Sequence, residues 1–93
     1  MVVDECETQL VICNQRGLHA RAAAVFVKCL SSIDAEVFVE KDGQRVDGNS
    51  ILSLMMLAAS KGSTIRVCAK GKEARRAIDE LTILVNSRFG EDQ

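Results

Sequence analysis

The chain has 93 residues, of which 47% are hydrophobic and 27% are charged, and its formal net charge is −1. A chain of this length supports one compact domain with a modest core, so we expect residues 1–93 to form a single domain. Twelve basic residues are scattered among thirteen acidic ones and the only aromatic residues are three phenylalanines, which argues against a nucleic-acid interface.

The first predicted elements are a strand and an amphipathic helix. Residues 7–13 alternate between polar and apolar before they end in an apolar run, which is typical of a strand with one better-buried face. Residues 14–17 interrupt this strand. From residue 20 to about 32 the apolar residues recur at helical spacing, and they are Ala22, Phe26, Cys29, Leu30 and Ile33.

A hairpin, a short helix, a strand and a long helix follow. Residues 36–40 alternate at period two, Asp42-Gly43 favours a tight turn, and residues 44–46 return antiparallel. Ser50 is a good N-cap for a helix that ends near residue 59. Residues 63–69 predict another strand. The last helix spans about 72–88, with Gly90 past its end and an apolar stripe of Ala74, Ala77, Ile78, Leu81, Leu84 and Val85.

The resulting order, β-α-β-β-α-β-α, predicts an α+β fold. A hairpin in the middle and helices between the strands favour a four-stranded antiparallel sheet with three helices on one face. The face of the sheet that packs on the helices is expected to carry Leu10, Ile12, Val37, Val39, Ile65 and Val67. Such folds serve several functions, so function has to be argued from the site.

Membrane insertion, metal binding and cofactor binding are not expected. No apolar run approaches the roughly 20 residues that cross a bilayer, and residues 1–7 do not resemble a secretory signal. We therefore expect a cytoplasmic protein, which we also expect to be a monomer. Only one histidine is available to complete a metal cluster, and no C-x-x-C pair occurs among Cys6, Cys13, Cys29 and Cys68.

The segment between the first strand and the first helix carries the candidate site. Gly17 allows a sharp turn, and His19 falls at or near the N-cap of the helix. The first amides of a helix lack partners within it, so the N–H groups of Ala20 and Arg21 are expected to bind an anion held on the His19 ring. The Arg21 guanidinium adds a charge-assisted contact.

The chemistry of imidazole makes His19 a candidate phosphoryl carrier. A neutral imidazole is a competent nucleophile near neutral pH, and its N–P bond is labile enough for the group to be passed on. A lone histidine at a strand-to-helix junction is also typical of a helix cap or a surface residue. The combination of Gly17, His19 and Arg21 at one helix start favours phosphate chemistry.

The middle helix is apolar on two sides. One stripe contains Leu54, Leu57, Ala58 and Lys61, and the other contains Leu52, Met55, Met56 and Ala59. A short surface helix cannot bury both, so one stripe is expected to serve as a docking patch for partner proteins. A deeper position for the helix, or a dimer that covers it, would also account for the pattern.

Two segments carry a resemblance to a known family. Gly17-Leu18-His19-Ala20-Arg21 resembles the active-site signature of HPr, the histidine-containing phosphocarrier of the bacterial phosphotransferase system, and Asn49-Ser50-Ile51 resembles its second signature. The resemblance covers nearly the whole chain. It implies an open-faced β-sandwich, in agreement with the predicted order of elements.

The resemblance assigns a role to each matching residue. It implies that His19 accepts a phosphoryl group on Nδ1 from enzyme I and passes it to an EIIA-type protein. Enzyme I is itself phosphorylated by phosphoenolpyruvate. The resemblance also implies that Arg21 stabilises the phosphate on His19. Ser50 matches the serine that an ATP-dependent HPr kinase/phosphorylase modifies in some bacteria, although serine is also an ordinary N-cap. The residues implied in partner docking are Ala20, Ala24, Ile51, Leu52 and Met55.

The chain departs from the family pattern at Ala22, where the family usually has proline. Alanine is the best helix former, so we expect slightly looser local order without loss of chemistry. Three segments resemble the nitrogen-related form of HPr, called NPr, more than the sugar-transport form. They are residues 54–62, Asn86-Ser87 and the acidic end, Gly90-Glu91-Asp92. Two alternatives are a regulatory binding protein of HPr fold controlled through Ser50, and a ferredoxin-like nucleic-acid module.

Overall fold

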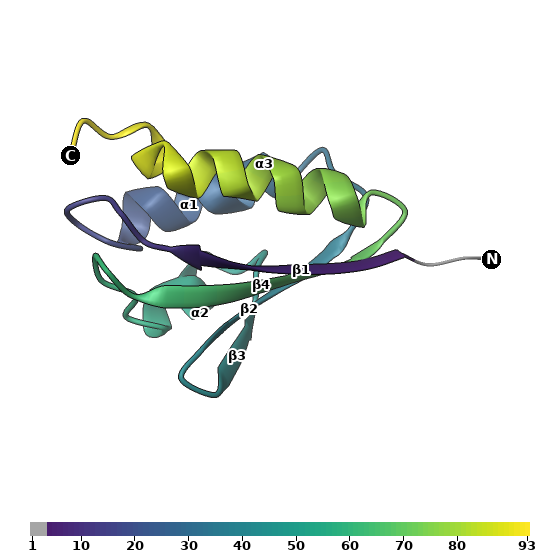
Figure 1. Cartoon of the computed structure of the whole chain (residues 1–93), viewed down its shortest axis with the longest axis horizontal. Coiled ribbons are helices and arrows are strands. Elements are labelled where there is room, and N and C mark those ends of the chain that lie inside the picture. The colour runs from purple at the N-terminus through teal and green to yellow at the C-terminus, as the bar shows by residue number, and fades with distance from the viewer. Residues whose placement is uncertain (1–3) are drawn as a thin grey trace.

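A computed structural model describes residues 4–93 and shows a four-stranded antiparallel sheet with three α-helices (Figure 1). The strands are β1 (Asp4–Val11), β2 (Glu36–Lys41), β3 (Gln44–Asp47) and β4 (Thr64–Gly71). The helices are α1 (Ala20–Leu30), α2 (Ile51–Met56) and α3 (Ala74–Asn86), and a 3-10 turn, η1 (Arg88–Gly90), follows α3. The predicted order and fold class are therefore confirmed.

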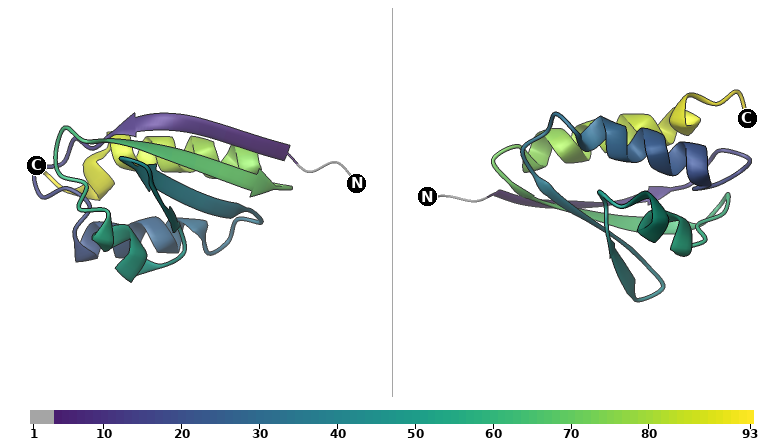
Figure 2. Two further views of the ribbon diagram at one scale, coloured as in Figure 1. Left: turned by 90° about the horizontal axis from the view of Figure 1, so that it is seen from below. Right: turned by 180° about the vertical axis from the view of Figure 1, so that it is seen from behind.

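The strands lie in the order β1-β4-β2-β3, and every neighbouring pair is antiparallel. Leu10 faces Ile65 across the β1–β4 pair, and Val39 faces Val67 across the β2–β4 pair. Helices α1 and α3 cover one face of the sheet, whereas the other face is left open (Figure 1). Helix α2 lies beside the N-terminal end of α1 (Figure 2).

The core lies between the covered face of the sheet and the helices. All six residues that were predicted to face the helices are buried: Leu10, Ile12, Val37, Val39, Ile65 and Val67. Alternation at period two puts them on one face, and the helical stripes close over them. From α1 the core receives Ala22, Phe26 and Leu30, and from α3 it receives Ala74, Ala77, Ile78, Leu81 and Val85. Cys29 and Leu84, which the prediction placed in these stripes, are only partly buried.

Two predicted element boundaries differ from those in the structure. The prediction that the first strand reaches Cys13 is wrong, because the strand ends at Val11 and the Cys13 thiol turns to donate to the Val85 carbonyl, 3.2 Å away. The prediction that the second helix runs to about 59 is also wrong. It ends at Met56, since Ala58 adopts a left-handed φ of 51° that no α-helix continues through.

Ser50 is the N-cap of α2, as expected, because its hydroxyl oxygen accepts the amide of Ser53 at 3.2 Å. The last helix is shorter than predicted at both ends. It begins at Ala74, after Glu73 in the N-cap position, and stops at Asn86. The chain then enters η1, where Arg88 and Phe89 have φ of 59° and 55°, which ends the helical path.

Within residues 4–93, no helix has both the length and the apolar character that a membrane crossing requires. Over the same residues, no group of three histidine, cysteine or acidic side chains is arranged to hold a metal ion. The four cysteines are free thiols, each partly buried.

Candidate functional site

His19 is the N-cap residue of α1. Its backbone is extended, with φ −81° and ψ −176°, and its carbonyl accepts the amide of Ala23 at 2.8 Å. Among the described residues the imidazole makes no cap hydrogen bond, so the ring is not used as a helix cap. The side chain is 17% exposed and stands where the unpaired amides of the first turn of α1 begin.

The turn before His19 is held against the loop that follows α2. Gly17 has a left-handed φ of 68°, and the next amide, of Leu18, donates to the Ala59 carbonyl at 2.9 Å. A Cβ atom added at Gly17 would lie 2.5 Å from the Ala59 oxygen. Glycine is thus required here for its conformation and for the close approach of two backbones. The site and the end of α2 are coupled through this contact.

The Gly17→Ala variant is expected to lose about 2 kcal/mol of unfolding free energy, because a left-handed alanine is strained and its Cβ displaces the loop after α2. Gly43→Ala is a matched control. Gly43 also has a positive φ, of 82°, but no described atom lies within 4 Å of the place that a Cβ would take. Urea unfolding of both variants measures the difference, and equal losses would contradict the role of the close approach.

The carboxyl-terminal segment returns to His19 and contacts its ring. Glu91 Oε2 lies 2.6 Å from His19 Nε2, and Glu91 Oε1 accepts the side-chain amide of Asn14 at 3.0 Å. The same Asn14 nitrogen donates to the Gly17 carbonyl at 2.8 Å. The amide of Gln15 donates to the Gln93 carbonyl at 2.9 Å. The loop and the tail therefore form one hydrogen-bonded unit around the imidazole.

The charge state of Glu91 follows from these contacts. Burial favours the neutral acid and raises the pKa of this carboxyl group, but the hydrogen bonds from Asn14 and His19 favour the anion, and the net pKa is lowered. Glu91 is therefore a carboxylate at neutral pH.

Arg21 lies at the edge of a hollow of about 410 Å³ next to the tail. The hollow is lined by Gln15, Arg16, Arg21 and the residues from Phe89 to Gln93. His19 itself lines a neighbouring hollow of about 220 Å³, together with Arg16, Leu18 and the loop after α2. Arg16 lines both hollows, whereas Arg21 lines only the hollow next to the tail.

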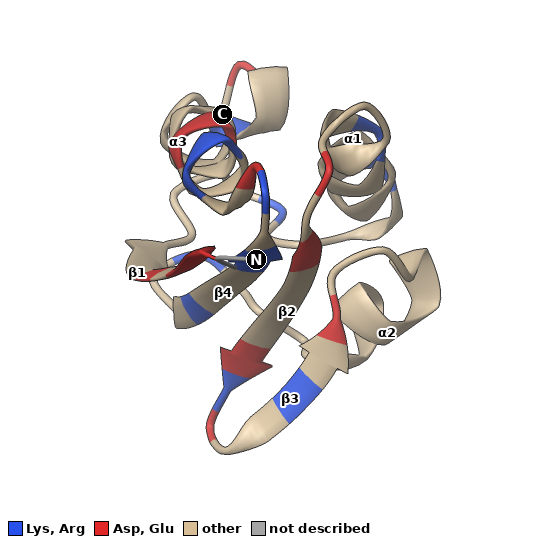
Figure 3. Ribbon diagram, turned by 90° about the vertical axis from the view of Figure 1, so that its right-hand side faces the viewer, with Lys and Arg blue, Asp and Glu red and all other residues tan. Residues whose placement is uncertain are grey.

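The residues expected to dock partners are all exposed: Ala20 and Ala24 on α1, and Ile51, Leu52 and Met55 on α2. Met56 is exposed as well, whereas Ala59, which the sequence grouped with them, is buried. Leu54 is the buried residue of α2, and Leu57, which follows the helix, is buried as well. Helix α2 contains no charged residue, and it is uniformly tan in Figure 3. An uncharged, apolar surface therefore lies beside the start of α1.

Sequence reasoning missed Asn14 and Glu91. In the sequence Asn14 belongs only to the break after the predicted first strand, yet its side chain is fully buried. Glu91 is, in the sequence, only one residue of an acidic end. No spacing rule connects residue 91 with residue 19, since their contact depends on the turn η1 and on the packing of Phe89.

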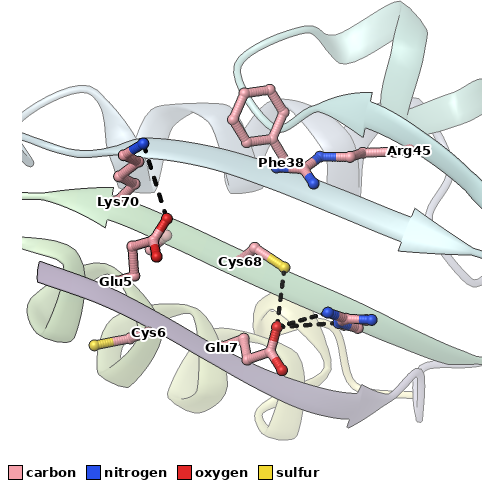
Figure 4. Close-up of a pocket in the computed structure, with 9 residues that line it drawn as sticks. Glu5, Cys6, Glu7, Phe38, Arg45, Cys68 and Lys70 are labelled. Atoms are coloured by element: carbon pink, nitrogen blue, oxygen red, sulfur yellow. Dashed lines mark hydrogen bonds and ion pairs between the residues drawn. The ribbon is translucent and has the colours of Figure 1, made fainter.

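A third hollow, of about 340 Å³, lies on the open face of the sheet (Figure 4). Arg66 pairs there with Glu7 at 2.8 Å, Lys70 lies 3.8 Å from Glu5, and the Arg45 guanidinium stacks 4.4 Å above the ring of Phe38. The hydrogen bond from Arg66 lowers the pKa of the Glu7 carboxyl. Each of the two carboxylates is thus paired with a basic side chain, and such exposed ion pairs are typical of a solvated sheet face.

Comparison with known proteins finds relatives along nearly the whole chain. Residues 6–87 match the family model described as the PTS HPr component phosphorylation site. A phosphocarrier protein HPr of Neisseria meningitidis is 45% identical over 88% of this chain and 92% of its own length. A phosphocarrier protein NPr of Shewanella violacea is 39% identical over 91% of this chain and 93% of its own length.

Solved structures give the same result for the fold. An HPr from Thermoanaerobacter tengcongensis superposes with a TM-score of 0.90 at 39% identity, over 95% of this chain and 99% of that one. An HPr from Bacillus anthracis superposes with a TM-score of 0.83 at 34% identity, over 87% and 96%. The family model and these relatives span nearly all of the described elements, and so the chain belongs to the HPr family of phosphocarrier proteins.

Proposed function

We propose that this chain accepts a phosphoryl group on Nδ1 of His19 from phosphorylated enzyme I and transfers it to an EIIA-type protein of the phosphotransferase system. The observation that supports this most is the position of the imidazole. It is partly exposed at the N-terminus of α1, and it is bonded through Nε2 to Glu91. The other ring nitrogen is then the one available for phosphorus.

The first turn of α1 and the nearby arginines stabilise the phosphoryl group. The amides of Ala20 and Arg21 have no partner within the helix and carry the positive end of its dipole. The guanidinium of Arg21 adds a charge-assisted contact. The helix has no acidic residue in its first turn to compete with the phosphate.

The exposed apolar side of α2, with Ala20 and Ala24, is the surface that receives enzyme I and the EIIA-type protein in turn. Ile51, Leu52, Met55 and Met56 are exposed there. Methionine suits a surface that has to fit more than one partner, because its unbranched side chain adapts. One surface that serves both partners keeps donor and acceptor from binding at the same time.

Replacing Leu52 by glutamine is expected to raise the KM of enzyme I for this chain about tenfold with kcat unchanged, because a docking contact is lost while the site is intact. Leu52 is 69% exposed, so the fold is not affected. Ile83→Gln is the matched control, since Ile83 is 68% exposed but lies on α3. Steady-state kinetics with both variants test the surface. An equal rise in KM for the two would refute it.

Ser50 is proposed as a site of regulatory phosphorylation by an HPr kinase/phosphorylase. Its hydroxyl lies at the start of α2, next to Ile51 and Leu52. A phosphate at a helix N-terminus is tolerated by the helix, while its charge opposes docking on the adjacent apolar surface. A regulatory binding protein controlled through Ser50 is the alternative function, and it would carry no phosphate on His19.

The deciding experiment incubates the purified chain with enzyme I and ³²P-labelled phosphoenolpyruvate. The proposed function predicts an acid-labile, alkali-stable adduct on His19, located by mass spectrometry under alkaline conditions. Adding an EIIA-type protein should discharge the adduct. A chain that stays unlabelled, or a label on another residue, would rule out the proposal. Comparing EIIA-type proteins of the sugar and the nitrogen-related branches would show which branch the chain serves.

A further inference from the structure

We propose that Glu91 is a positioning residue for phosphoryl transfer: its carboxylate holds the proton of His19 on Nε2, and so leaves the lone pair of Nδ1 free to attack phosphorus. This inference rests on the proposed function. It extends that function to a residue outside both sequence signatures and contributed by the carboxyl-terminal tail.

The contact between the two side chains determines where the proton lies. Glu91 Oε2 and His19 Nε2 are 2.6 Å apart, which is a hydrogen-bond distance. A carboxylate only accepts hydrogen bonds, so the shared proton belongs to Nε2. A neutral imidazole has a single N–H, and its other nitrogen then carries a lone pair. The bond to Glu91 therefore selects one of the two ring tautomers.

The carboxylate is held on both of its oxygens. Oε1 accepts the side-chain amide of Asn14, which is fully buried and also donates to the Gly17 carbonyl. On one side of Glu91 in the chain Phe89 is buried, and on the other the Gln93 carbonyl accepts the amide of Gln15. The Glu91 side chain is itself only 15% exposed. Its orientation thus depends on several contacts besides that with the ring.

The transfer step balances without any further group. The Nδ1 lone pair forms a bond to the phosphorus of the phosphorylated donor protein, and the bond from phosphorus to the donor breaks with its electron pair. The His19 ring gains positive charge while the proton stays on Nε2, facing the Glu91 carboxylate. When a nucleophile of the acceptor protein attacks phosphorus, the bond from phosphorus to Nδ1 breaks, its electron pair returns to Nδ1 and the neutral ring is restored. Glu91 stabilises the charge that exists between these events.

The test compares the full chain with three variants. Glu91→Ala removes the carboxylate, and Glu91→Gln keeps its shape, but its amide can pair with either tautomer. Asp92→Asn is the matched control, because it removes the neighbouring carboxylate but keeps the backbone carbonyl of this residue, which accepts a hydrogen bond from Arg88. The ¹⁵N chemical shifts of the His19 ring are measured above the ordinary titration range of histidine, and initial rates of phosphoryl acceptance are measured with enzyme I.

The expected result is a ring with the proton on Nε2 in the wild type and in Asp92→Asn, and a mixture of tautomers in both Glu91 variants. In Glu91→Ala, kcat should fall roughly tenfold with KM unchanged, which is the lower end of the loss seen when a carboxylate that orients a metal-bound imidazole is removed. Wild-type ring shifts and rates in both Glu91 variants would overturn the positioning role while leaving the proposed function intact. A wild-type chain that accepts no phosphoryl group would overturn both.

Discussion

The His19→Gln variant is expected to accept no measurable phosphoryl group from enzyme I, a loss of at least about a thousandfold in rate. Glutamine matches imidazole in polarity, but its amide nitrogen has no free lone pair for phosphorus. Its side chain can still donate a hydrogen bond to Glu91, so the tail should stay in place. The measurement is transfer of label from phosphoenolpyruvate through enzyme I, with wild type in parallel.

A fold control separates lost chemistry from lost structure. His19 is an N-cap residue, but among the described residues its ring makes no capping hydrogen bond. Its replacement should therefore change the unfolding free energy by less than about 1 kcal/mol. Circular dichroism and urea unfolding check this. Labelling of the variant at a wild-type rate would mean that another side chain carries the phosphoryl group.

The Phe26→Ala variant is expected to lose about 3–5 kcal/mol of unfolding free energy. Phe26 is fully buried in α1 and is among the largest of the fully buried side chains. Its removal leaves a cavity under the helix that positions His19. Because small domains are stabilised by only about 5–15 kcal/mol, a large part of the population would unfold on warming.

Urea unfolding at room temperature measures this loss, with Ile83→Ala as the control. Ile83 is an apolar helical residue too, but it lies on α3 and is largely exposed, so its truncation should cost less than about 0.5 kcal/mol. Similar midpoints for the two variants would mean that Phe26 contributes far less to the core than its burial indicates.

Period and turn chemistry explain why most of the fold was predictable. Successive side chains along a strand point to opposite faces of the sheet, so Val37 and Val39 could be assigned to the core from the sequence alone. The Asp42-Gly43 turn adopts positive φ at both residues, as this hairpin dipeptide favours. Local sequence and final packing agree at these positions.

Long-range contacts explain what was not predictable. The early end of α2 is followed by a loop whose Ala59 carbonyl accepts the amide of Leu18, which lies far away in the sequence. Glu91 reaches His19 because two left-handed residues in η1 turn the chain back. Periodicity describes the residues along one helix or strand, and it carries no information about contacts between residues that are far apart in the sequence. The signature around His19 was visible because its residues are contiguous.

The tail has a practical consequence for handling the protein. Gln93 is bonded to the loop that precedes His19, whereas Asp4 opens β1 at the opposite end of a molecule 41 Å long (Figure 1). An affinity tag or surface linker joined after Gln93 would crowd the imidazole and its partners. Immobilisation through the amino-terminal end leaves that region open, and it is the orientation to choose for binding measurements.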